Sequence, residues 1–151
     1  MIIFASIYIQ FRISLLVYMD RLFYIVFNSY YKHGTYKNDI PPLTVFGIFC
    51  IAIFSNLLLL RDVILLLNDP MYFRTHKASG IIPYLIASAI ITYFTFYYRK
   101  RYVKIYERYC HITLYNGILA KMIAFTLMIF LISLPILFAL LYNKFYFGNW
   151  I

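Results

Sequence analysis

Acidic residues are scarce in this chain. Its 151 residues include five Asp or Glu against 14 Lys or Arg, and the only Glu is Glu107. General acid–base catalysis commonly relies on a pair of carboxylates, and the sequence offers no such pair. Its three histidines, His33, His76 and His111, form no H-x-x-x-H pattern and sit beside no carboxylate cluster. We therefore expect no metal site.

Cysteine and glycine are also rare, with two and five residues. Cys50 lies inside an apolar run, Cys110 follows a basic segment, and neither belongs to a C-x-x-C motif, so we expect no disulfide or zinc site. The sequence has no glycine-rich phosphate-binding loop and no G-x-S-x-G nucleophile motif. These absences predict a protein that is not an enzyme and that carries no cofactor.

Long apolar runs dominate what remains. Hydrophobic residues make up 64% of the chain, and the mean hydropathy is +0.78. A soluble domain of this size would leave too much apolar surface exposed to water. Residues 43–67, 80–98 and 117–142 are each near the roughly 20 residues needed to cross a bilayer as a helix. The sequence predicts an all-α integral membrane bundle, with residues 1–151 as a single membrane domain and three transmembrane helices.

Residues 2–29 allow two interpretations. At about 100° per residue, one helical stripe is polar, and its members are Gln10, Ser14, Arg21 and Asn28. This pattern is typical of an amphipathic helix at the membrane interface. A fourth span is the alternative, at a cost of about 2.5–3.5 kcal/mol for each central charge, which an Asp20–Arg21 pair near one end would lower. Met19 is a second candidate start, besides Met1.

The basic residues gather in one segment. Residues 99–121 hold six Lys or Arg against one Glu, within a net charge of +9. Placing 1–42 and 99–121 in the cytoplasm puts ten Lys or Arg there and four outside, the pattern that positive charges follow in membrane proteins. This distribution favours a membrane protein over a nucleic-acid binder. It predicts a cytoplasmic segment 99–121 and an external C-terminus.

We expect the span 80–98 to continue without a break as a basic helix over 99–112, because that segment contains no Gly or Pro. One interpretation is that its cations only determine the membrane topology. The other is that they also contact anionic lipid headgroups or another anionic ligand. The residues concerned are Arg99, Lys100, Arg101, Lys104 and Arg108.

Small and ionisable polar residues interrupt the apolar runs. Ser88, Thr92 and Thr95 share one helical face, an arrangement that lets helices approach closely. Adjacent residues point about 100° apart on a helix, so we expect Arg61 and Asp62 to form a poor mutual pair. Together with Asn56, these residues serve helix packing or line a polar pathway.

The order of two spans, a basic tyrosine-rich helix and a final span resembles small uncharacterised multi-span membrane proteins of Bacteroidetes-type bacteria. The residues that carry the resemblance are Tyr30-Tyr31-Lys32, Asp39-Ile40-Pro41, Tyr93-Phe94, Arg101-Tyr102 and Lys104-Ile105. It covers about residues 19–142. The resemblance implies a location in the bacterial inner membrane and no defined activity.

The expected function is association within the membrane, as a homo-oligomer or as a small subunit of a larger complex. Its partners would be anionic lipid headgroups and another membrane subunit or a second copy, and not nucleic acid. The alternative is an oligomeric channel or membrane-disrupting effector, gated through the basic helix. Its pore would be lined by Asn56, Arg61, Asp62 and Lys121.

Overall fold

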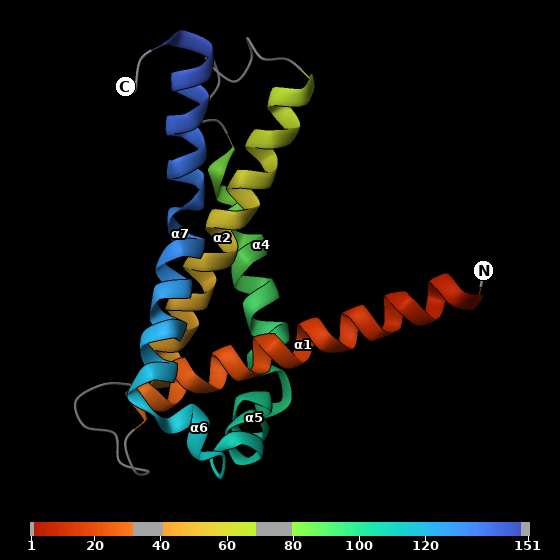
Figure 1. The fold of residues 1–151 in the computed structure, drawn as a ribbon, viewed down its shortest axis with the longest axis vertical. Helices are drawn as coiled ribbons and strands as arrows, with labels where there is room; N and C mark the ends of the chain where they lie inside the picture. The colour runs from red at the N-terminus through yellow and green to blue at the C-terminus, as the bar shows by residue number, and fades with distance from the viewer. Residues whose placement is uncertain (1, 32–40, 69–79, 149–151) are drawn as a thin grey trace. The chain divides into compact units, whose positions relative to one another are not determined.

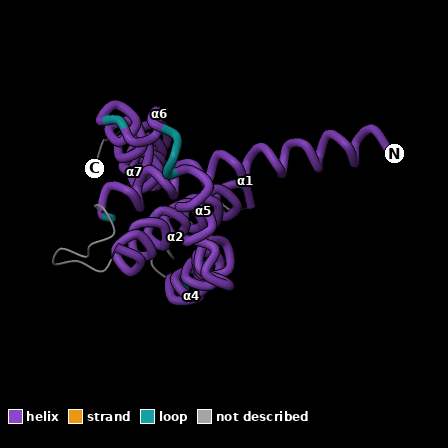
Figure 2. Tube along the Cα trace, turned by 90° about the horizontal axis from the view of Figure 1, so that it is seen from below, coloured by secondary structure: helices purple, strands orange, loops and turns teal. Residues whose placement is uncertain are grey.

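The computed structural model describes residues 2–31, 41–68 and 80–148, and its regular elements there are all helical (Figure 1). Coloured by secondary structure, these segments are helix apart from short turns (Figure 2). The helices are α1 (Ile2–Tyr30), α2 (Pro41–Asn68), α4 (Ile81–Thr92), α5 (Arg101–Tyr109), α6 (Thr113–Asn116) and α7 (Ile118–Phe147). The predicted all-α fold is confirmed.

Three runs in the described segments are long and apolar enough to cross a membrane. They are Pro42–Asn68, Ile81–Tyr109 and Ile118–Phe145, and they contain most of the predicted spans 43–67, 80–98 and 117–142. The predicted N-terminal helix over 2–29 is present as α1. Among the helices that the structure describes, α1 is not one of the candidate spans.

The expected continuation of the second span into a helix over 99–112 is wrong, because the backbone breaks at Arg99 and Lys100. After α4, a π-helical turn (Tyr93–Tyr97) and a 3-10 turn (Tyr98–Lys100) end the span. The φ angles of Arg99 and Lys100 are 52° and 55°, in the left-handed region. This conformation costs a residue other than glycine about 1–2 kcal/mol. As a result, α5 is a separate helix, and it ends at Tyr109.

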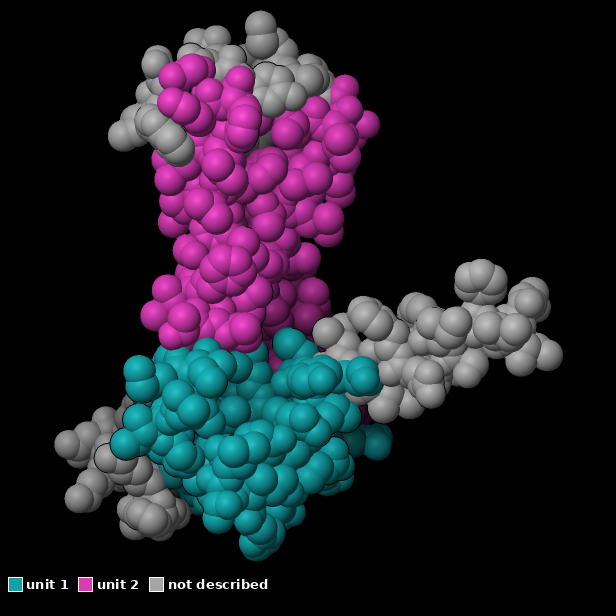
Figure 3. Space-filling model, in the orientation of Figure 1, with its two compact units in different colours: residues 1–45, 99–125 teal, residues 46–98, 126–151 magenta. Residues whose placement is uncertain are grey.

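The chain forms two compact units (Figure 3). Unit 1 comprises residues 1–45 and 99–125, and therefore contains α1, α5, α6 and the first turns of α7. Unit 2 comprises residues 46–98 and 126–151, and contains most of α2, all of α4 and the rest of α7.

Unit 1 is held together by aromatic rings from α1 and α5. Phe27 and Tyr24 are buried on α1, and the Tyr106 ring of α5 lies 5.8 Å from the Tyr24 ring and 6.0 Å from the Phe27 ring, between centroids. Tyr31, directly after the end of α1, meets Tyr106 edge-on at 5.0 Å between ring centroids. Aromatic pairs in such geometries contribute about 0.5–1.5 kcal/mol each beyond the area they bury.

In unit 2, α2 contacts both α4 and α7. Phe49 of α2 is buried edge-on against Phe96, with ring centroids 4.9 Å apart. Further along α2, the Asn56 side-chain amide donates to the Leu131 carbonyl of α7 at 3.3 Å. Large side chains therefore pack α2 against the π-helical turn Tyr93–Tyr97 that follows α4, and a polar contact joins α2 to α7.

Candidate functional site

The five basic residues predicted to contact an anion do not act as one group in the structure. Arg99, Lys100 and Lys104 are exposed, whereas Arg101 donates to both carboxylate oxygens of Asp20 on α1, at 2.9 and 3.1 Å. Arg108 lies 4.0 Å from the same carboxylate, with 64% of its side chain exposed. Part of the cationic face of α5 therefore neutralises a carboxylate of unit 1.

Asp20 is buried, with only 6% of its side chain exposed. A buried carboxylate is costly unless it is paired and hydrogen-bonded, and Arg101 supplies both. The expected partner, Arg21, instead places its guanidinium 5.6 Å from the centre of the Tyr18 ring and 5.8 Å from that of the Tyr115 ring. The proposed Asp20–Arg21 pair is thus replaced by contacts of each residue with α5 or α6.

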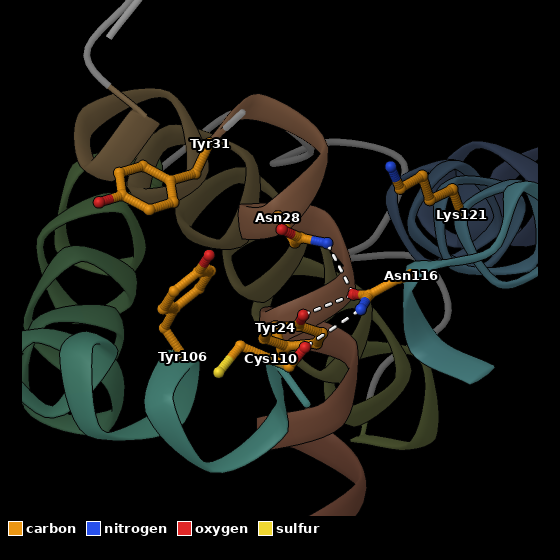
Figure 4. A pocket seen from close by; sticks show the side chains of 7 residues that line it. All are labelled: Tyr24, Asn28, Tyr31, Tyr106, Cys110, Asn116 and Lys121. Carbon is orange, nitrogen blue, oxygen red and sulfur yellow. Dashed lines mark hydrogen bonds between the residues drawn. The ribbon is translucent and has the colours of Figure 1, made fainter. Parts of the chain in front are cut away.

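Unit 1 contains a pocket of about 510 Å³ (Figure 4). Residues of α1, α5, α6 and α7 form its wall, together with Tyr31 just after α1 and Cys110 just after α5. They are Tyr24, Asn28, Tyr31, Tyr106, Cys110, Asn116 and Lys121. The pocket thus combines phenols, amides, a thiol and one ammonium group.

A hydrogen-bond network centred on Asn116 fixes one side of the pocket. The Tyr24 hydroxyl donates to Asn116 Oδ1 at 2.6 Å, and Asn28 Nδ2 donates to the same oxygen at 2.9 Å. Asn116 Nδ2 in turn donates to the Cys110 carbonyl at 3.2 Å. Burial, reinforced by the nearby Tyr106 and Cys110, raises the pKa of the Tyr24 phenol to about 12. Tyr24 is therefore a neutral hydrogen-bond donor at physiological pH.

The polar residues of the spans lie inside unit 2. Ser88 and Thr92 are fully buried, and Thr95 is half-buried. Ser88 donates to the Leu85 carbonyl at 2.8 Å, while the Cys50 thiol of α2 lies 3.3 Å from the Ser88 oxygen. Ser88 therefore contacts α2 of the same chain, within unit 2.

Arg61 and Asp62 do pair, against the expectation from their spacing. Arg61 Nε and Nη2 both donate to Asp62 Oδ1, at 2.9 and 2.7 Å. The two side chains are 10 and 14% exposed, and the Arg61 guanidinium lies 5.8 Å from the centre of the Tyr84 ring. The Arg61 side chain is long enough to bend back toward Asp62, although adjacent side chains leave a helix about 100° apart.

Groups suited to catalysis or metal binding are sparse in the segments that the structure describes. In those segments, no three His, Cys, Asp or Glu side chains lie close enough to hold a metal ion. His111 is exposed, and His33 and His76 lie outside the described residues.

Sequence reasoning did not single out Asp20, Tyr24, Asn28, Tyr106 or Asn116 as members of one site. One signal was present, because Asp20, Tyr24, Phe27 and Tyr31 recur at spacings of four, three and four and so share a helical face. The partners of this face lie more than 70 residues away in the sequence. Only the fold brings them together.

The described residues form an all-α fold with three helices that are candidate membrane spans. These features are those of an all-α membrane protein. No protein-family model, curated protein or solved structure matches the chain.

Proposed function

We propose that the chain is a non-enzymatic integral membrane protein that acts by association, as a homo-oligomer or as a small subunit of a membrane complex. The membrane would be the inner membrane of a bacterium, with residues 99–121 in the cytoplasm and the C-terminus outside. Anionic lipid headgroups would contact the exposed cations Arg99, Lys100 and Lys104.

The observation that carries this proposal is how little of each span the chain itself covers. Only 22, 17 and 11% of the most apolar stretches of the three candidate spans is buried within the protein. The smallest share belongs to Ile118–Phe145, on α7. That helix leaves large apolar side chains such as Ile129 and Phe130 exposed, while Met128 is buried. Its outward face is available to lipid or to another helix.

The polar groups of the spans support association over the channel alternative. A pore requires polar side chains that line a path between copies. Asn56 is instead hydrogen-bonded to backbone carbonyls of α2 and α7, and Arg61 is paired with Asp62. Lys121 borders the pocket of unit 1. These contacts leave an apolar outward surface, as expected of a helix that packs against other membrane segments.

Cysteine crosslinking in the native membrane tests the proposal. Starting from a Cys50→Ala, Cys110→Ser background, Ile129→Cys places a thiol on the exposed face of α7. Met128→Cys is the matched control, because it places the thiol one residue away on the buried face. We expect Ile129→Cys to crosslink to a second copy or to one other membrane protein, and Met128→Cys to react far less.

Native mass spectrometry of the gently extracted protein gives an independent readout. A homo-oligomer or a stoichiometric complex supports the proposal. A monomer by mass spectrometry, together with no adduct from Ile129→Cys, refutes it. Conductance of reconstituted protein that is lost in Arg61→Leu would establish the channel alternative instead.

A further inference from the structure

The pocket of unit 1 has the size and the chemistry of a ligand site. Its volume of about 510 Å³ lies within the range of roughly 300–1,000 Å³ typical of small-molecule sites. Rings form much of its wall, and a few polar groups converge on it from separate helices, the usual composition of such sites. The pocket does not belong to the apolar face used for association.

Hydrogen bonds within the protein preorganise the polar side of the pocket. Tyr24 is 1% exposed, and its hydroxyl is held by Asn116, which also binds Asn28 and the backbone at Cys110. Each member of this network restricts the rotamer of the next. A ligand would therefore meet a rigid frame and lose little affinity to the ordering of side chains.

The charge of the pocket selects an anion. Lys121 is the one basic residue among the seven that line the pocket, and no carboxylate lines the wall. Lys121 is half-buried in the first turn of α7, where desolvation strengthens its attraction for an anion. Figure 4 shows the Lys121 side chain extending from α7 with its amino group above the Asn116 network, and the Tyr106 hydroxyl across the pocket, in the space between α1 and α5.

The position of Lys121 near the start of a candidate span indicates which class of anion the pocket binds. It lies three residues after Ile118, where a candidate span begins, a rise of about 4.5 Å along a helix. The candidate span Ile118–Phe145 has 28 residues, about 42 Å of helix. This length matches the roughly 40–45 Å of a bilayer with its headgroups, so a residue in the first turn of the span lies in the headgroup region. A phosphate presents oxygens in several directions and so matches donors that come from three different helices. A carboxylate presents two oxygens in one plane.

We propose that this pocket binds a phosphate group carried on a small polar body. Lys121 is its charged partner, and the Asn28 amide and Tyr106 hydroxyl donate further hydrogen bonds. The phosphate belongs to the headgroup of an anionic phospholipid or to a soluble phosphomonoester. Arg99, Lys100 and Lys104 are not among the residues that line this pocket, and the proposal does not depend on the oligomeric state.

The test uses the full chain, purified in a neutral detergent. Isothermal titration with sn-glycerol 3-phosphate and with inorganic phosphate measures the soluble source. Native mass spectrometry after addition of phosphatidylglycerol, with phosphatidylcholine as the comparison lipid, measures the headgroup source. Because that spectrum also reports the oligomer, a failure of binding is distinguished from a failure of association.

Two variants probe the pocket, and one controls for charge. Lys121→Gln should weaken binding at least about tenfold, because a hydrogen bond to a charged group is lost. Tyr106→Phe keeps the ring packing and should weaken binding about threefold to tenfold. Lys144→Gln removes the same charge from an exposed lysine in the last turn of α7 and should change binding less than about twofold.

Binding of glycerol phosphate that depends on Lys121 and Tyr106 identifies a soluble ligand. Selective phosphatidylglycerol adducts with the same dependence identify a lipid headgroup. The proposal is overturned if neither probe binds. It is overturned equally if Lys144→Gln weakens binding as much as Lys121→Gln, since the attraction would then be general electrostatics. Tyr106→Phe decides the matter if Lys121→Gln does not fold.

Discussion

The ion pair between Asp20 and Arg101 is the shorter of two charge contacts from α5 to the Asp20 carboxylate of α1. Asp20→Asn removes the negative charge and keeps the shape of the side chain. Arg101→Gln removes the guanidinium and leaves a buried carboxylate. The two single variants and the double variant form a thermodynamic cycle, which isolates the energy of the pair.

The structure sets the expected size of the coupling. Charges about 4 Å apart attract by about 4 kcal/mol at an effective dielectric constant of about 20, before the cost of removing them from water. Asp20 is 6% exposed and Arg101 is 34% exposed, so that cost falls mainly on the carboxylate. The pair lies between exposed pairs, worth about 0.2–1 kcal/mol, and buried pairs, whose disruption costs about 3–5 kcal/mol. We expect a coupling free energy of about 1.5–3 kcal/mol.

Arg101→Gln should destabilise more than Asp20→Asn. It leaves the carboxylate with Arg108, 4.0 Å away and largely exposed, as its remaining charged neighbour within salt-bridge distance among the described residues. The free energy of unfolding can be measured by titration with dodecyl sulfate in mixed micelles, followed by circular dichroism.

Glu107→Gln is the matched control for Asp20→Asn, because it removes a carboxylate from the exposed face of α5. Its effect should stay below about 0.5 kcal/mol. A coupling below about 0.5 kcal/mol between Asp20 and Arg101 would refute the reasoning. So would a destabilisation by Glu107→Gln equal to that by Asp20→Asn.

Three further predictions concern the backbone, a phenol and the small-residue stripe. Lys100→Gly should stabilise the protein by about 0.5–1 kcal/mol, because glycine accepts the φ of 55° at this position. Lys104→Gly causes the same loss of charge inside α5 and should destabilise the protein by about 1 kcal/mol. If thermal unfolding showed both variants to be stabilised or both to be destabilised, backbone strain at Lys100 would be contradicted. Burial raises the pKa of the Tyr24 phenol to about 12 in the folded protein. The protonated phenol therefore contributes fully to the free energy of unfolding at pH values below about 10, the pKa of tyrosine in an unfolded chain. This contribution is lost as pH rises toward 12, by up to about 2–3 kcal/mol. Stability measured against pH should therefore fall more steeply over this range in the native chain than in Tyr24→Phe, and parallel curves would argue against it. Ser88→Leu should cost about 1–3 kcal/mol by overpacking the contact with α2. Thr92→Val, which keeps the shape and loses one hydrogen bond within its own helix, should cost about 1 kcal/mol or less in the same titration; equal costs would mean that Ser88 does not face α2.

The apolar runs were sufficient to predict the helical class and the position of the spans. A bilayer requires about 20 apolar residues per helix, and residues 43–67, 80–98 and 117–142 satisfy that need locally. Ser88 and Thr92 are both buried, and their spacing of four residues places them on one side of a helix. These features depend on neighbours within a few turns.

The break after the second span was not predictable from residue type. Left-handed backbone is usually marked by Gly or Asn, and here it falls on Arg99 and Lys100. The pocket escaped prediction for a different reason. Its frame joins Tyr24 and Asn28 to Asn116, across 92 and 88 residues of sequence, and no local pattern encodes that proximity.

The neighbouring charges of Arg61 and Asp62 also bear on how α2 responds to voltage. A membrane potential acts on a helix through its net charge, by about 2.3 kcal/mol per elementary charge for roughly 100 mV. Because the two side chains are held together at 2.7 Å, they form a dipole with no net charge. A change in membrane potential therefore exerts almost no net force on this pair, and α2 is poorly suited to sense voltage.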